Sequence, residues 1–381
     1  MSASLDRPIN RYGLTEINGS YIDANVDIVL VHGVDGHPER TWTSGWNGKS
    51  KVLWPSQLLP PMIEEKKARI LVYGYDACLT SFMDGDAGGK IHNHAEHLIA
   101  ELCANRRIRK ATERPIVFVA HSLGGLVVKR ALIYSSEVRG NYMEHLRSVY
   151  VSTYGILFLG TPRLGVDLTK WHSRLGRIWV ATNLGPDFDE DYNDFLSQWL
   201  DAVEINCETI QNIDRQFIQL IHRYHVYFFH EGELTKIRGD YCYTVEEQSA
   251  APVIQDVERA CIQQNHAQMC KFEDDDTPGF SVVAEGIQRY AAEGPAIIQR
   301  RWETEKAERQ RSKEMVAKEL IGITESAITQ AYPVDLAGHV IDRMAPNDSG
   351  PMRRNHSESQ HCYYFNFLNF FSANKSSHRN G

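Results

Sequence analysis

Residues Arg114–Leu132 read RPIVFVAHSLGGLVVKRAL and form the most informative part of the chain. The run Pro115–Ala120 is continuously apolar and rich in β-branched residues, which predicts a strand covered on both faces. The residues from Leu123 to Ser135 space their apolar side chains as an amphipathic helix does. Ser122 stands between the two. This order of strand, tight turn and helix predicts a sharp bend that projects the Ser122 hydroxyl from the edge of a sheet.

Small residues flank the predicted bend. Ala120 lies two positions before the serine and Gly124 two positions after it. Small side chains at these places let a strand and the following helix approach closely. Ala120 stands where glycine is usual, and alanine still fits the space. The context therefore favours a catalytic serine over an ordinary loop serine.

The first two-thirds of the chain alternate short apolar runs with longer amphipathic stretches, which predicts an α/β fold with a mostly parallel, doubly wound sheet. Tyr12–Ile17 is expected to add an antiparallel edge strand. The predicted helices are Trp54–Lys66, His92–Asn105 and Leu123–Ser135. The predicted strands are Val26–His32, Arg69–Tyr73, Pro115–Ala120, Gly155–Leu159, His225–Phe229 and Tyr241–Val245.

Two regions interrupt this pattern. Residues 164–223 are rich in tryptophan and helical in pattern, so we expect a helical cap insertion, which either forms a lid over acyl chains or covers the sheet. Arg300–Ala317 is charged on nearly all sides and predicts an exposed helix. We therefore predict an α/β domain over 1–298 and a charged helix with a poorly ordered tail over 299–381.

A serine hydroxyl becomes a good nucleophile only when a base accepts its proton and an acid orients that base. In a sheet of this kind the chain order is serine, acid, histidine. His266 follows the predicted strands and precedes a predicted helix, so it is the candidate base. Glu231 follows the strand His225–Phe229 and is the candidate acid.

Other carboxylates remain open as the acid. The same loop also carries Glu233 and Asp240, and Glu246 and Glu247 follow the next predicted strand. Each of these groups would otherwise be an ordinary solvated side chain of a loop.

The oxyanion formed by nucleophilic attack needs backbone N–H donors that are already in place. One donor is expected in the turn that follows the first buried strand, where His32-Gly33 precedes Val34. The second is the amide that follows the nucleophile. The predicted oxyanion hole therefore consists of the amides of Val34 and Leu123.

Composition excludes several classes of function. Hydrophobic residues make up 42% of the 381 residues, as in a globular protein, and 41 Lys+Arg against 49 Asp+Glu give a net charge of −8. That charge argues against a nucleic-acid partner and against a polybasic membrane anchor. His92, His94 and His97 lie close in sequence, but a solvated helix face explains them better than a metal site. We predict neither a metal nor an organic cofactor.

No apolar run is as long as the roughly 18 to 20 residues that span a bilayer, and Met1–Asn10 has no apolar core of a signal peptide. Seven cysteines without a CxxC pair are typical of free thiols in a reducing compartment. We therefore expect a cytoplasmic protein. Tyr363–Phe371 is apolar enough to dock onto a partner or a membrane surface.

Six stretches together resemble the α/β-hydrolase superfamily, and within it the serine esterases of the serine-active-site-containing type. That domain also stands at the N-terminus of fungal NACHT and ankyrin-repeat proteins. The resemblance extends from about Tyr12 to Tyr290. The stretches are VDIVLVHGVDGHPERTWT (Val26–Thr43), LWPSQLLP (Leu53–Pro60), RILVYGYDA (Arg69–Ala77), RPIVFVAHSLGGLVVKRAL (Arg114–Leu132), STYGILFLGTPRLG (Ser152–Gly165) and NHAQMCKF (Asn265–Phe272).

The resemblance implies a lipase- or esterase-like fold with Ser122 as nucleophile, His266 as base and an oxyanion donor after His32-Gly33. The family's Gly-Thr-Pro-His-Arg-Gly reads GTPRLG at 160–165, a departure that concerns packing beside the site. Relatives are linked to mitochondrial and reticular membranes, which would imply peripheral membrane contact. No P-loop follows the resembling region.

The leading hypothesis is a serine hydrolase that cleaves carboxylic esters, of small acyl or lipid-like substrates, through an acyl-enzyme. A thioesterase or a transacylase would use the same three residues. The alternative from another class is a catalytically inactive hydrolase fold that serves as a recognition or signalling module. The sequence predicts no oligomeric state.

Overall fold

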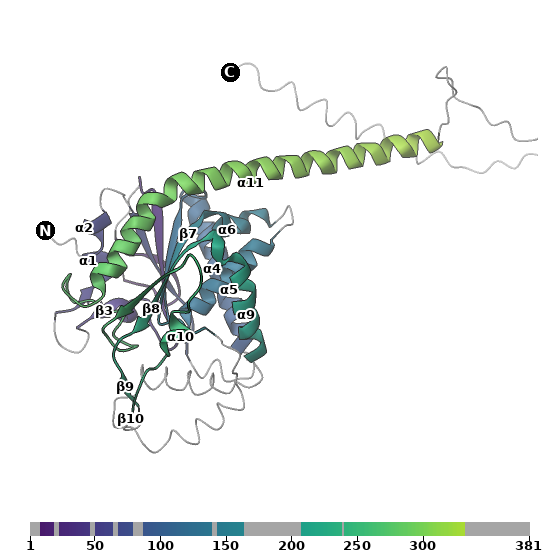
Figure 1. Cartoon of the computed structure of the whole chain (residues 1–381). Coiled ribbons are helices and arrows are strands. Elements are labelled where there is room, and N and C mark those ends of the chain that lie inside the picture. Colours follow the sequence, from purple (N-terminus) through teal and green to yellow (C-terminus); the bar gives the residue numbers. More distant parts are fainter. Residues whose placement is uncertain are drawn as a thin grey trace, which may run out of the picture. The chain divides into compact units, whose positions relative to one another are not determined.

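A seven-stranded sheet forms the centre of the molecule, with strand order β1-β5-β2-β6-β7-β8-β11 (Figure 1). All neighbouring strands run parallel except β1, which pairs antiparallel with β5 at one edge. The sheet strands are β1 Gly13–Glu16, β2 Val26–Val31, β5 Ala68–Gly74, β6 Ile116–His121, β7 Thr153–Leu159, β8 His225–Glu231 and β11 Glu258–Ile262. The predicted mostly parallel, doubly wound sheet and its antiparallel edge strand are confirmed.

The computed structural model describes residues 8–18, 23–45, 50–63, 68–78, 87–138, 143–163, 207–237 and 240–331. Residues 164–206 of the predicted insertion, and the tail beyond 331 with Tyr363–Phe371, lie outside the described residues. The chain divides into two compact units, Met1–Ser312 and Lys313–Gly381. The predicted boundary at 298/299 falls inside helix α11 (Phe280–Ala331).

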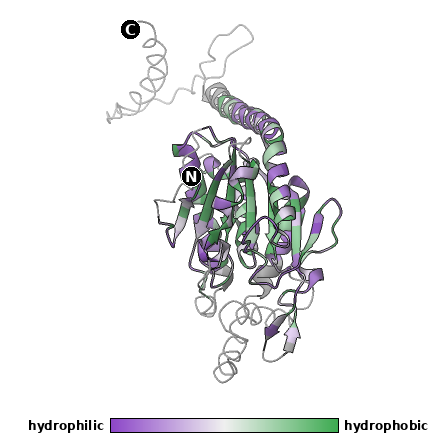
Figure 2. Cartoon of the chain, turned by 90° about the vertical axis from the view of Figure 1, so that its left-hand side faces the viewer, coloured by the Kyte–Doolittle hydropathy of each residue, from purple (hydrophilic) through white to green (hydrophobic). Residues whose placement is uncertain are grey.

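Helices cover both faces of the sheet, and the strands between them are strongly apolar (Figure 2). One face packs against α4, α5 and α9, and the other against α1, α2 and the first part of α11 (Figure 1). The helices are α1 Trp54–Gln57, α2 Pro60–Ile63, α4 Ala87–Ile108, α5 Gly124–Glu137, α6 Ser148–Ser152, α9 Cys207–Leu220, α10 Glu247–Ala250 and α11, and the 3₁₀ turns are η1 Arg40–Trp42, η3 Glu144–Arg147 and η4 Ile221–Arg223.

The sequence prediction fails at one strand. Tyr241–Val245 was expected in the sheet because of its aromatic and β-branched residues, but only Asp240–Cys242 forms a strand, β10. It pairs with β9 (Thr235–Ile237) in a two-stranded hairpin outside the sheet. The last sheet strand is β11, whose side chains are mostly half-buried or exposed. An edge strand needs no continuous apolar run, which is why β11 lacks the expected pattern. The remaining two-residue strands are β3 Thr43–Ser44 and β4 Val52–Leu53.

Helix α9 begins directly after residues 164–206, which lie outside the described residues. A buried ion pair joins α9 to α5. Lys129 donates to Asp214 at 2.8 Å, with both side chains less than a tenth exposed. The Lys129 ammonium also lies over the rings of Phe158 and Phe217. Charge pairing in this apolar setting favours a single orientation of α9.

Asp27, on β2, is the centre of a buried cluster of charges. It is fully buried and accepts hydrogen bonds from Arg69 Nε at 2.9 Å, from Arg114 Nη1 at 3.0 Å and from Arg106. Burial alone would raise the pKa of Asp27, but the attraction of Arg106, Arg69 and Arg114 outweighs it and lowers the pKa. The cluster joins β2, β5, α4 and the turn before β6, next to the amino edge of the sheet.

Among the helices of the described residues, none combines the length and the apolar character needed to cross a bilayer.

Candidate active site

Ser122 occupies the strained bend that the sequence predicts between β6 and α5. Its φ is +53°, a left-handed conformation that is uncommon for a residue with a side chain. Its amide donates to Leu159 O at 2.9 Å, which ties the bend to the neighbouring strand β7. Strain held in place by surrounding structure is characteristic of functional positions.

Two glycines allow the turn after β2 to lie directly against this bend. A Cβ on Gly33 would come within 2.7 Å of Ser122 Cβ, and a Cβ on Gly124 within 2.3 Å of His32 O. Neither position can hold a larger residue without displacement of the backbone. The turn that carries Val34 therefore lies beside the serine, and Leu123 follows the serine at the start of α5.

His266 reaches the serine from the loop after β11, far away in sequence. The His266 ring is fully buried, and its Nε2 lies 3.1 Å from Ser122 Oγ. This distance is within hydrogen-bond reach, as proton transfer requires. Gly160, with φ +58°, leaves room for the ring, since a Cβ there would come within 3.0 Å of His266.

Glu231, the last residue of β8, is the carboxylate that faces the other ring nitrogen. Its Oε1 lies 3.8 Å from His266 Nδ1, and both side chains are almost completely buried. Oε1 also accepts a hydrogen bond from the Val245 amide. Within the described part of the chain, Glu231 Oε2 and His266 Nδ1 have no hydrogen-bond partner.

The alternative acids are placed differently. Glu233 is exposed, and Glu246 and Glu247 are exposed at the start of α10. Glu247 accepts a hydrogen bond from Arg259 at 2.9 Å. The side chain of Asp240 lies outside the described residues.

His121, immediately before Ser122, makes a further contact with His266. It is buried, and its Nε2–H donates to the backbone carbonyl of His266 at 3.0 Å. Burial lowers the pKa of His121 well below its ordinary value, and the adjacent His266 ring lowers it further. His121 therefore stays neutral and keeps the donor that positions the backbone of His266.

The turn beneath the predicted oxyanion hole is held by His32 and Tyr75. His32 Nδ1 donates to Gly33 O at 3.0 Å, and the Tyr75 amide donates to Nε2 at 3.4 Å. Tyr75 Oη donates to His32 O at 2.8 Å, and the two rings stack 4.5 Å apart. Burial lowers the pKa of His32 to about 4, so a neutral ring supplies both hydrogen bonds near pH 7.

The structure does not place a metal cluster near this site. No group of three or more His, Cys, Asp or Glu side chains could hold a metal ion in the part of the chain that the structure describes. His92 interacts instead with Glu96, at 3.2 Å, and accepts a hydrogen bond from Arg130 Nε.

Sequence reasoning missed several residues that shape the site. His121 and Gly160 lie in motifs that were interpreted through other residues, and Val245 lies in none. Each of the three acts through a contact that its position in the sequence does not predict. The Gly-Thr-Pro run after β7 was the one available indication for Gly160.

Comparison with known proteins finds similarity over the part of the chain that contains Ser122. Residues 27–185 match a family model described as "Putative serine esterase (DUF676)". Among curated proteins, Protein SERAC1 of Danio rerio is 28% identical over 160 residues, and Protein SERAC1 of Bos taurus is 25% identical over 162 residues. Both alignments cover 38% of this chain and 23% of the relative, so the matched region spans about a quarter of the length of these relatives.

Among solved structures, a lipase-esterase related protein from Clostridium acetobutylicum is 12% identical and covers 74% of this chain and 100% of its own, with a TM-score of 0.36. A fungal esterase from Rhizomucor miehei is also 12% identical, covering 74% of this chain and 79% of its own, with a TM-score of 0.43.

Proposed function

We propose that this chain, an α/β-hydrolase fold whose residues 27–185 match the serine esterase family, is a serine hydrolase that cleaves carboxylic esters. The observation that carries the proposal is the 3.1 Å contact between His266 Nε2 and Ser122 Oγ at a bend with positive φ. A nucleophile beside a base, with a carboxylate behind the base, is the arrangement that acyl transfer requires.

The reaction begins when Ser122 Oγ attacks the acyl carbonyl and His266 Nε2 accepts the serine proton. The carbonyl oxygen becomes an oxyanion, for which we propose the amides of Val34 and Leu123 as donors. His266 then passes its proton to the leaving alcohol, which departs and leaves an acyl-enzyme on Ser122. Water, activated by the same histidine, releases the acid and restores the serine.

In this reaction Glu231 stabilises the protonated form of His266. When Nε2 takes the proton, the ring becomes a cation with Nδ1–H directed at the buried carboxylate. The Val245 amide holds Glu231 Oε1 in place while this charge forms. Catalytic hydrogen bonds are often long before substrate binds, so the 3.8 Å separation is compatible with this role.

The same separation is the one observation that favours a second candidate, an inactive hydrolase fold used for recognition. A base that no carboxylate orients would be a poor catalyst. A thioesterase or transacylase would retain the same three residues and differ only in its acyl donor or acceptor. We therefore propose a class of substrates, acyl esters of small or lipid-like type, and no single compound.

The proposed function is tested with a fluorophosphonate probe, which reacts only with an activated serine. We expect labelling of the folded protein at Ser122, mapped by mass spectrometry of the digested protein. Unfolded protein should not react, because the contact between His266 and Ser122 would be lost. Absence of label at Ser122 in folded protein would contradict the proposal.

Replacement of Glu231 by Gln is expected to lower kcat/KM by about 10²–10⁴-fold. The amide nitrogen of Gln can donate to His266 Nδ1, which favours the tautomer whose Nε2–H cannot accept the serine proton. The matched control is Glu233→Gln, which removes an exposed carboxylate nearby and should stay within about 2-fold of wild type. Equal activity of both variants would show that another acid orients His266.

A further inference from the structure

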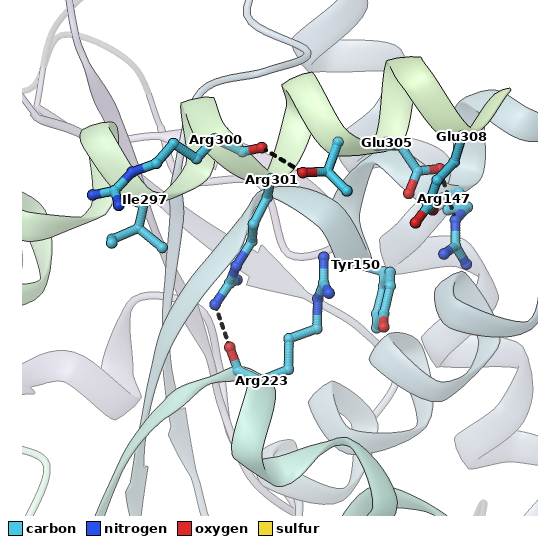
Figure 3. A pocket seen from close by; sticks show the side chains of 9 residues that line it. Arg147, Tyr150, Arg223, Ile297, Arg300, Arg301, Glu305 and Glu308 are labelled. Carbon is cyan, nitrogen blue, oxygen red and sulfur yellow. Dashed lines mark hydrogen bonds and ion pairs between the residues drawn. The ribbon is translucent and has the colours of Figure 1, made fainter. Parts of the chain in front are cut away.

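A cavity lies at the amino ends of the sheet strands, away from Ser122 at the carboxyl end of β6. Ser122 follows the carboxyl end of β6, whereas this cavity lies where β7 begins at Thr153 and where η4 leads into β8. Its volume is about 440 Å³, and its walls come from η3, α6, η4 and the middle of α11 (Figure 3). We call it the arginine pocket, because Arg147, Arg223, Arg300 and Arg301 all line it.

The positive charge of the arginine pocket exceeds its negative charge. Two carboxylates, Glu305 and Glu308, also line it. Glu305 is already shared, because it accepts hydrogen bonds from Arg147 Nε and from Arg309 Nε, each at 2.9 Å. These two arginines lower the pKa of Glu305 against the opposing effect of burial. Glu305 is therefore ionised, and the two arginines balance its negative charge.

Arg301 donates hydrogen bonds to two backbone carbonyls. Its Nη1 donates to Thr153 O at 2.7 Å, and its Nη2 donates to Arg223 O, as Figure 3 shows. These bonds orient the guanidinium without cancelling its charge. Burial lowers the pKa of Arg301, and the adjacent Arg223 guanidinium lowers it further, which is the expected effect of two like charges held close together.

Arg223 places an unpartnered donor beside the pocket. Its guanidinium carbon lies 4.2 Å from the centre of the Tyr150 ring, within the range of a cation–π contact. Within the residues that the structure describes, its buried Nε has no hydrogen-bond partner. A buried donor without a partner costs free energy that a bound acceptor would recover.

We propose that the arginine pocket binds a phosphate group through Arg223, with Arg301 beside it. A guanidinium presents a planar pair of donors that matches two phosphate oxygens, and a dianion satisfies two adjacent arginines at once. The cavity is large enough for a phosphate with a small organic substituent. The ligand class is therefore a phosphomonoester, either free in solution or as a lipid headgroup.

Binding of soluble phosphate is measured on the whole chain by thermal unfolding and calorimetry. The ligands are inorganic phosphate and glycerol 3-phosphate, compared with chloride at equal ionic strength. Phosphate stabilises many proteins through exclusion from their surface, so a rise in melting temperature alone is insufficient. Only the rise in melting temperature and the binding heat that are lost in Arg223→Gln count as specific binding.

Replacement of Arg223 by Gln should weaken binding about 10-fold or more, because a charge-assisted pair of hydrogen bonds is lost. The matched control is Arg109→Gln, which removes the same charge from an exposed residue near Glu16, and it should bind like wild type. Glu308→Gln removes a negative charge from the pocket wall and should tighten binding roughly 3-fold. This opposite effect keeps the test decisive if Arg223→Gln folds poorly.

Vesicles distinguish the two sources of phosphate. Co-sedimentation with phosphatidylcholine vesicles that contain phosphatidic acid, lost in Arg223→Gln and kept in Arg109→Gln, would support a lipid headgroup. Binding of glycerol 3-phosphate with the same dependence and without vesicle binding would support a soluble phosphomonoester. The proposal is overturned if neither ligand binds wild type, if folded Arg223→Gln binds like wild type, or, where Arg223→Gln does not fold, if Glu308→Gln binds like wild type.

Discussion

Replacement of Ser122 by Ala is expected to lower kcat/KM for a short-chain nitrophenyl ester by roughly 10⁴-fold or more, with little change in stability. In the proposed mechanism the Ser122 hydroxyl, which lies 3.1 Å from His266 Nε2, forms the acyl-enzyme, and alanine removes it. The measurement is steady-state hydrolysis followed by absorbance. Ser136→Ala is the matched control, since that serine lies near the far end of α5 and bonds only within its own helix through its hydroxyl.

A double variant separates catalysis from a general loss of structure. In the proposed mechanism Ser122 and His266 act as a unit, so Ser122→Ala, His266→Ala and the two changes together should give nearly the same residual rate. Multiplied losses in the double variant would mean that the residues act independently. Equal, slow rates for wild type and Ser122→Ala would instead favour the recognition module.

Replacement of Asp27 by Asn is expected to lower the free energy of unfolding by about 3–5 kcal/mol. Asp27 is fully buried and faces Arg69, Arg106 and Arg114, so its neutral replacement leaves buried guanidinium groups without a counter-charge. Urea unfolding followed by circular dichroism measures the change. Asp275→Asn, in an exposed turn, is the matched control and should alter stability by less than about 0.5 kcal/mol.

The same cluster predicts a dependence on pH. The pKa of Asp27 is lower in the folded chain than its ordinary value of 3.8, so the folded state binds its proton less readily than the unfolded state. The stabilising contribution is therefore complete above pH 3.8 and is lost as the pH falls below that value. The stability difference between wild type and Asp27→Asn should narrow in this acidic range. An unchanged difference would contradict the assignment.

Local pattern was sufficient for the centre of the fold. The run Pro115–Ala120, the Gly-Gly pair and the helix pattern after Ser122 predict the strand, the bend and the helix that the structure contains. Strands buried on both faces must be apolar along their whole length, so composition alone reveals them. The same argument fails at the sheet edge, where β11 is half-exposed, and at Tyr241–Val245, whose β-forming residues build a separate hairpin.

The choice among carboxylates lies beyond any local pattern. Glu231 and Glu233 are two residues apart and chemically identical, yet one is buried 3.8 Å from His266 and the other is exposed. That difference arises because β8 ends at Glu231, which turns this side chain toward a loop supplied by residues after β11.

The arginine pocket and the Asp27 cluster both bring together charged residues that are far apart in the sequence. Arg147, Arg223 and Arg301 are separated by up to about 150 positions, and they meet because η3, η4 and α11 lie together at the amino ends of the strands. Helices, turns and buried strands depend on interactions between residues close in sequence, so the amino-acid sequence alone predicts them. Contacts between charged groups depend on which distant segments pack together, and only the folded arrangement of the sheet and its helices sets that.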